Sequence, residues 1–89
     1  MSQVTRHRAT VGGHDVELEF DQKLQVLNRA RLFVDGRELD RTTVFYGEKD
    51  LTTTLDDGTS IAVRLHSGMV GELTRAQVRG ADGSWTDLT

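Results

Sequence analysis

Alternation of apolar and polar residues dominates this chain, and Asp-Gly pairs interrupt it at three places. The pairs are Asp35-Gly36, Asp57-Gly58 and Asp82-Gly83. Each lies between short runs of aliphatic, aromatic and β-branched residues. Tight hairpin turns favour Asp-Gly, because glycine adopts positive φ without strain and aspartate tolerates it. Strand periodicity on both sides of such turns predicts antiparallel strands joined by hairpins.

The first predicted hairpin covers residues 4–21, and two registers fit it. With Gly13-His14 at the tip, Val11 lies opposite Val16. With Gly12-Gly13 at the tip, the partners shift by two residues while each side chain keeps its face. Both registers therefore gather the same apolar residues on one face.

The second predicted hairpin has Asp35-Gly36 as a two-residue loop, which places Leu32 opposite Leu39 and Phe33 opposite Glu38. In that register Arg41 falls on the apolar face. Either a bulge reverses the alternation, or Arg41 lies beyond the core edge with its stem packed and its head in water.

Two further hairpins complete the pattern. A three-residue loop at residues 56–58 puts every apolar residue of the third hairpin on one face, with Leu51 opposite Val63. The last hairpin places Trp85 opposite Arg79. Residues 22–28 are ambiguous: they could start a helix, but we expect a turn followed by a strand from about residue 26 to 35.

Seven or eight short strands in consecutive hairpins predict an all-β fold, a single antiparallel β-sandwich or flattened barrel. The whole chain, residues 1–89, has a length that suits one domain with one core. No run of proline, glycine or serine marks a domain boundary.

Composition narrows the function without identifying it. The chain has no cysteine and a net charge of −3. It therefore has no disulfide framework, and it lacks the basic surplus of a phosphate-backbone binder. No apolar run approaches the ~20 residues of a membrane helix, and residues 1–5 are unlike a signal peptide. We expect a cytoplasmic protein that does not enter a membrane.

Two stretches resemble the opening of the Fas apoptosis inhibitory molecule family. They are Val-Glu-Leu-Glu-Phe at residues 16–20 and Arg-Leu-Phe-Val-Asp-Gly-Arg-Glu at residues 31–38. That family has a similar acidic strand followed by an aromatic-Val-Asp-Gly-basic-Glu hairpin. The resemblance covers about residues 14–66. It implies a compact β-sandwich without catalytic residues that works through protein contacts.

No arrangement of side chains predicts catalysis, a metal site or a cofactor. His7 and His14 lie at opposite ends of one strand, roughly 20 Å apart, and zinc sites need closely spaced ligands. His66-Ser67 has no Gly-x-Ser-x-Gly turn around it. Asp56-Asp57-Gly58 is the composition of a bulged turn and lacks the calcium-loop pattern.

Two groups of apolar residues are candidates for a protein contact. The candidates are Leu27, Phe33, Val44, Tyr46, Met69 and Val70. The first four share the face opposite Leu32 and form an exposed patch, unless the hairpin bends and buries both faces. The last two lie in a glycine-flanked loop, where they either plug the core or form a contact.

Two other binding classes compete with this hypothesis. His66, Met69 and Trp85 are candidates for a small-ligand groove at one end of the sandwich. Binding of single-stranded nucleic acid would need exposed aromatic rings beside arginines. Carboxylates on the neighbouring strands are expected to pair with these arginines and to neutralise their charge. We therefore expect a non-enzymatic interaction module that binds another protein or a second copy of itself.

Overall fold

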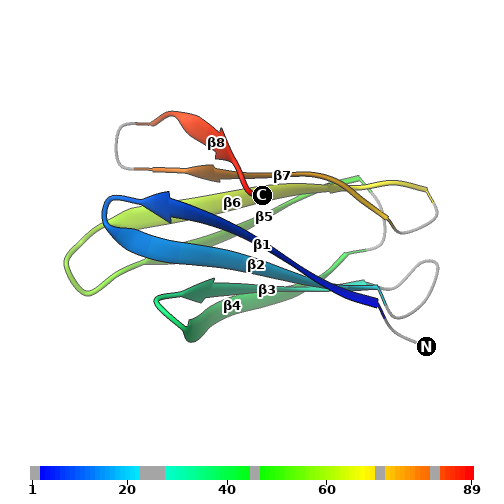
Figure 1. The fold of residues 1–89 in the computed structure, drawn as a ribbon, viewed down its shortest axis with the longest axis horizontal. Helices are drawn as coiled ribbons and strands as arrows, with labels where there is room; N and C mark the ends of the chain where they lie inside the picture. The colour runs from blue at the N-terminus through cyan, green and yellow to red at the C-terminus, as the bar shows by residue number, and fades with distance from the viewer. Residues whose placement is uncertain (1–2, 23–27, 45–46, 70–71, 81–82) are drawn as a thin grey trace.

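The structure, a computed structural model, describes residues 3–22, 28–44, 47–69, 72–80 and 83–89. Within them the chain forms eight strands (Figure 1). The strands are β1 (Gln3–Val11), β2 (His14–Gln22), β3 (Asn28–Val34), β4 (Arg37–Val44), β5 (Gly47–Thr54), β6 (Ser60–Ser67), β7 (Leu73–Arg79) and β8 (Trp85–Asp87). The prediction of an all-β fold is confirmed.

Consecutive antiparallel strands form two four-stranded sheets that face each other (Figure 1). The first sheet has the order β1-β2-β3-β4 and the second has the order β5-β6-β7-β8. The β1–β2, β3–β4 and β5–β6 turns lie at one end of this sandwich, which we call the turn end. None of the described residues forms a helix that could cross a membrane.

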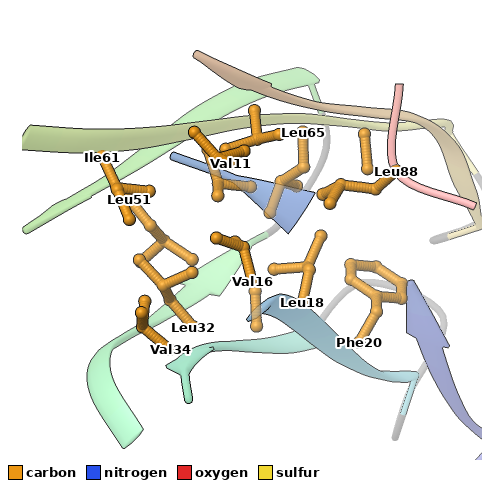
Figure 2. Close-up of a cluster of buried hydrophobic side chains, with 14 of the residues drawn as sticks. Val11, Val16, Leu18, Phe20, Leu32, Val34, Leu51, Ile61, Leu65 and Leu88 are labelled. Carbon is orange, nitrogen blue, oxygen red and sulfur yellow. The ribbon is translucent and has the colours of Figure 1, made fainter. Parts of the chain in front are cut away.

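One apolar cluster fills the space between the sheets, and Figure 2 shows side chains from both sheets meeting in it. Its buried members are Val11, Val16, Leu18, Phe20, Ala30, Leu32, Val34, Val44, Leu51, Ile61, Val63, Leu65, Ala76, Val78 and Leu88. Alternate positions along each strand supply them, as the period of two requires. Burying each large side chain contributes about 1.5–3 kcal/mol, so both sheets depend on the same layer.

Three hairpins adopt predicted registers. The first uses the Gly12-Gly13 tip, so Ala9 pairs with Val16. In the third, Leu51 pairs with Val63 and the Leu55 N–H donates to the Thr59 carbonyl at 2.8 Å, which closes the three-residue loop. The last hairpin pairs Arg79 with Trp85 as expected.

The second hairpin corrects two predictions. Phe33 pairs with Glu38, but Leu32 pairs with Asp40, because a β-bulge leaves Leu39 as the extra residue. The predicted Leu32–Leu39 pair is therefore wrong. Beyond the bulge the alternation reverses, so Val44 turns into the core and is only 2 % exposed. The prediction that Val44 shares an exposed face with Phe33 is wrong for the same reason.

A bulge also changes the start of β7. The register between β6 and β7 shifts between His66 and Ser67. Leu73, which the alternation places away from Ala76, packs against the core cluster instead.

Asn28, which interrupts the apolar pattern in the sequence, is buried at 1 % exposure. It donates to the Ser67 hydroxyl across the two sheets at 3.5 Å.

Candidate functional site

The outer face of the first sheet carries ion pairs that largely neutralise one another. The buried Glu19 forms one ion pair with Arg6, at 3.3 Å, and a second ion pair with Arg31. Arg31 reaches Glu38 as well, at 3.5 Å. Phe33, a predicted contact residue, lies half-buried on this face with the Arg31 guanidinium 6.0 Å from its ring centre. Arginines that are already paired with carboxylates have little positive charge left to bind the phosphates of a nucleic acid.

The outer face of the second sheet holds two of the predicted groove residues, and they lie apart from any described pocket. The guanidinium groups of Arg64 and Arg79 lie 4.6 and 5.5 Å from the centre of the Trp85 ring. His66 bonds Glu48 at 2.7 Å. Met69 lies beyond the end of β6 and is 87 % exposed, so it does not plug the core. None of the three pockets described below involves His66, Met69 or Trp85.

The outer edge of β1 is the first candidate site. The Arg8 N–H donates to the Thr89 carbonyl at 2.9 Å, and the Thr89 N–H donates to the Arg8 carbonyl at 3.0 Å. Backbone groups of an antiparallel strand point to alternate sides at successive residues. Val4, Arg6 and Thr10 therefore direct their N–H and C=O groups to the same side as Arg8, away from β2. Within the described residues, no strand covers this edge near Val4 and Arg6.

A narrow slot adjoins this edge, between β1 and β7. It has a volume of about 140 Å³ and is lined by His7, Leu73, Thr74, Arg75, Ala76 and Leu88. Strand β8 pairs with β7 only from Gln77 to Arg79. Among the described residues, the start of β7 is therefore paired with β6 but has no strand on its other side. The slot thus has an open strand edge on one wall and apolar side chains at its base.

The turn end is the second candidate site, and His14 is its centre. The His14 Nδ1 lies 2.8 Å from Asp35 Oδ2, and its Nε2 lies 3.2 Å from Asp57 Oδ2. Asp35 belongs to the β3–β4 turn of the first sheet, and Asp57 belongs to the β5–β6 turn of the second. The imidazole therefore joins the two sheets where their turns meet.

These contacts shift the pKa values of all three groups. Hydrogen bonds that the ring donates to Asp35 and then to Asp57 raise the pKa of His14 above its ordinary value of 6.5. The Thr59 backbone N–H, the Thr59 hydroxyl and His14 lower the pKa of Asp57 to about 2. His14, followed by the Asp15 backbone N–H, lowers the pKa of Asp35. The Asp57 contribution to stability is present above the ordinary carboxyl pKa and is lost as pH falls toward 2.

A pocket of about 320 Å³ lies under His14 at the turn end. It is lined by His14, Val34, Asp35, Arg37, Leu39, Thr54, Leu55, Asp56 and Asp57. Its base is apolar and its rim is charged, which is the usual composition of a small-molecule site. A third, open hollow of about 430 Å³ lies between the β5–β6 turn and Arg79.

Within the described residues, neither candidate site groups metal ligands or places a nucleophile against His14. Among the residues that the structure describes, no group of three or more His, Cys, Asp or Glu could hold a metal ion. His14 has both ring nitrogens engaged by carboxylates, and no serine, threonine or cysteine nucleophile is bonded to it. The arrangement is suited to holding two turns together, since the ring and the carboxylates satisfy one another.

The predicted contact residues are only partly placed by the structure. Leu27, Tyr46 and Val70 lie outside the described residues, and Val44 is in the core. Phe33 and Met69 are accessible but lie on different parts of the molecule. The sequence pattern missed both the β1 edge and the His14 contacts. The Asp-Gly turns themselves were the available signal, because three consecutive hairpins must return their tips to one end.

Comparisons with protein-family models, with curated proteins and with solved structures find no match to this chain. The resemblance to the Fas apoptosis inhibitory molecule family therefore stays a prediction. What this molecule can bind has to be inferred from its own β1 edge and turn end.

Proposed function

We propose that this protein is a non-enzymatic interaction module that binds an extended segment of a partner protein in the slot between β1 and β7. The observation that carries this proposal is the backbone pairing of Thr89 with Arg8. It supports the proposal because the β1 edge already pairs with one extended residue, while among the described residues no strand lies on the outer side of Val4 and Arg6. Addition of a strand to such an edge is a common mode of peptide recognition.

The side chains around the slot indicate the chemistry of the partner. His7 and Arg75 line it, and no carboxylate does. Apolar Leu73 and Leu88 also line it. A bound strand would present alternate residues to these two environments, so the partner segment should alternate acidic with aliphatic residues. Val4, at 49 % exposure, offers a further apolar contact.

The cellular location belongs to this proposal as well. A chain of this length without cysteine fits a reducing compartment, because small domains in oxidising compartments often depend on disulfides. We place the module in the cytoplasm, where its partner would also be found.

A designed peptide tests the proposal directly. A synthetic nine-residue peptide that alternates glutamate with valine is titrated into ¹⁵N-labelled protein, with a lysine–valine peptide as the charge control. We expect the acidic peptide to shift the amide signals of Val4, Arg6 and Arg75 and the lysine peptide to leave them unchanged. Equal shifts with both peptides, or shifts confined to the turn end, would contradict the proposal.

Proline substitutions provide a matched pair of variants. Val4→Pro removes an N–H that points away from the sheet, which edge strands tolerate, and should abolish peptide binding. Thr10→Pro removes an N–H of the same orientation on the other side of Arg8 and should retain binding. If sedimentation shows a dimer that Val4→Pro dissociates, the occupant of the edge is a second copy of the chain.

Small-ligand binding is a second candidate, and the turn-end pocket favours it. A ligand there would contact Leu55 and should stabilise the protein in a thermal screen. A Leu55→Gln variant should lose that stabilisation, whereas Val4→Pro should keep it.

A further inference from the structure

The contacts of His14 depend on the protonation state of its ring. Both ring nitrogens lie against carboxylate oxygens, Nδ1 against Asp35 and Nε2 against Asp57. A carboxylate can only accept a hydrogen bond. Only the imidazolium form has a proton on both nitrogens, so only that form can donate to both turns at once.

The two contacts differ in how firmly the aspartate is held. Asp35 Oδ1 accepts the Asp15 N–H at 2.9 Å, and the Asp35 N–H donates to the Asp15 carbonyl at 2.8 Å. These bonds hold Asp35 beside His14 within the first sheet. Asp57 is on the other sheet, at the longer distance of 3.2 Å. It is retained in its own turn by the Thr59 N–H at 2.9 Å.

Loss of the ring proton would therefore act mainly on the contact between the sheets. A neutral ring can keep its Nδ1 proton on Asp35, and its Nε2 then turns a lone pair toward Asp57. Two acceptors in contact repel each other, and Asp35 and Asp57 are no longer separated by a positive charge. The β5–β6 turn loses its attachment to the first sheet.

We propose that His14 is a pH-sensitive latch that closes the turn end of the sandwich when it is protonated and releases the β5–β6 turn when it is neutral. The latch residues His14, Asp35 and Asp57 line the same pocket as Val34, Leu39 and Leu55. Release of the latch would separate the first-sheet wall of this pocket from the β5–β6 turn and expose more of these apolar side chains. This proposal is independent of strand binding at the β1 edge, which lies on another part of the molecule.

The charged groups around the ring support this direction. The groups that face His14 or share its pocket are Asp15 of β2, Asp35 of the β3–β4 turn, Arg37 of β4, and Asp56 and Asp57 of the β5–β6 turn. Carboxylates outnumber Arg37, so the surroundings stabilise the imidazolium. The pKa of His14 is accordingly raised, and the latch is closed below that value and opens as pH rises through it.

Methyl signals at the base of the pocket give the test. ¹H–¹³C spectra of the methyl groups of Val34, Leu39 and Leu55 are recorded between about pH 5 and pH 9, the range of an imidazole titration. We expect these signals to titrate together with the His14 ring. We also expect amide exchange at Thr59, corrected for its intrinsic rate, to become about threefold faster at the high end.

Three variants make the result decisive. His14→Gln cannot titrate and should abolish the methyl titration. Asp57→Asn can donate its amide to a neutral ring, so it should keep the turns together at every pH and likewise abolish it. His66→Gln is the matched control, because the His66 ring contacts Glu48 on the outer face of the second sheet, away from the turn end, and it should leave the titration unchanged.

The latch is contradicted if the wild-type methyl signals do not move with pH. It is also contradicted if they titrate equally in His14→Gln or in Asp57→Asn. Either of these two variants is sufficient for the test if the other does not fold.

Discussion

Single residues with positive φ determine how the turns of this protein close. Asp35 has a φ of 52° and Gly36 has a φ of 84°, which is the pair of left-handed residues that a tight hairpin turn needs. Gly58 has a φ of 88° and closes the bulged β5–β6 turn. A Cβ atom added at Gly58 would meet no atom within 4 Å, so the preference for glycine over alanine here is a matter of backbone conformation.

Substitution of Gly58 should therefore isolate the cost of the left-handed backbone. We expect Gly58→Ala to lower the free energy of unfolding by about 1–2 kcal/mol, as measured by urea denaturation. Gly58→Asn should lose less, because asparagine tolerates this conformation better than alanine does. Equal losses in the two variants would indicate a steric rather than a conformational cause.

At the scale of elements, a line of charges across the first sheet joins its strands. Glu19 of β2 is 5 % exposed and has Arg6 of β1 on one side and Arg31 of β3 on the other. The two arginines differ in their own exposure, which is 58 % for the Arg6 side chain and 33 % for that of Arg31. The ion pair with Arg31, the less exposed partner, should therefore contribute more to the free energy of unfolding than the ion pair with Arg6.

Removal of each arginine in turn tests this ranking. Arg31→Ala leaves a buried carboxylate with one exposed partner and should lower the free energy of unfolding by about 1–3 kcal/mol. Arg6→Ala should lower it by less than about 1 kcal/mol, as surface ion pairs do. Denaturant unfolding of the two variants measures both values, and a larger loss in Arg6→Ala would contradict the assignment.

The elements could be predicted from sequence where local chemistry determines them. The Asp-Gly loops and the alternation around them were sufficient for the β5–β6 and β7–β8 registers. The alternation left a bulge before Arg41 as one of two alternatives, and the structure confirms it at Leu39. The sequence could not choose between them, because a regular and a bulged register differ only in what the distant half of the core accepts. Asn28 breaks the apolar alternation of β3 because its side chain is polar, although this side chain points into the core.

The candidate sites were less accessible to sequence analysis than the strands were. His14 lies 21 positions from Asp35 and 43 from Asp57 in the chain, and nothing local indicates that the three meet. Likewise, which part of the β1 edge is paired depends on the position of Thr89, which is 81 residues away from Arg8 in the sequence. Contacts of this kind arise from the packing of the two sheets and require the fold to be known.

At the scale of the whole molecule, one cluster supports both sheets. Leu18 and Leu32 come from the first sheet, Val63 and Leu65 come from the second, and all four are fully buried. The Asn28–Ser67 and His14–Asp57 contacts also cross between the sheets. A sheet that separated would leave the apolar face of the other sheet in water, so neither sheet should persist alone.

We therefore expect a single unfolding transition. Trp85, the one tryptophan of the chain, lies in the second sheet and reports on it through its fluorescence, whereas far-ultraviolet circular dichroism reports on both sheets. The two probes should give coincident denaturation curves. A fluorescence change that precedes the loss of β-structure would show that the second sheet, or its last hairpin, unfolds separately.

The place where Thr89 meets β1 has a practical consequence for anyone who fuses another sequence to this protein. Because Thr89 pairs antiparallel with Arg8, residues joined after it are directed along β1 toward Val4. A linker or affinity tag attached there would act as a tethered competitor at high local concentration. Attachment ahead of Gln3 avoids placing the added segment along β1 in this way. The choice of fusion site would therefore decide whether a pull-down can recover a partner that binds the β1 edge.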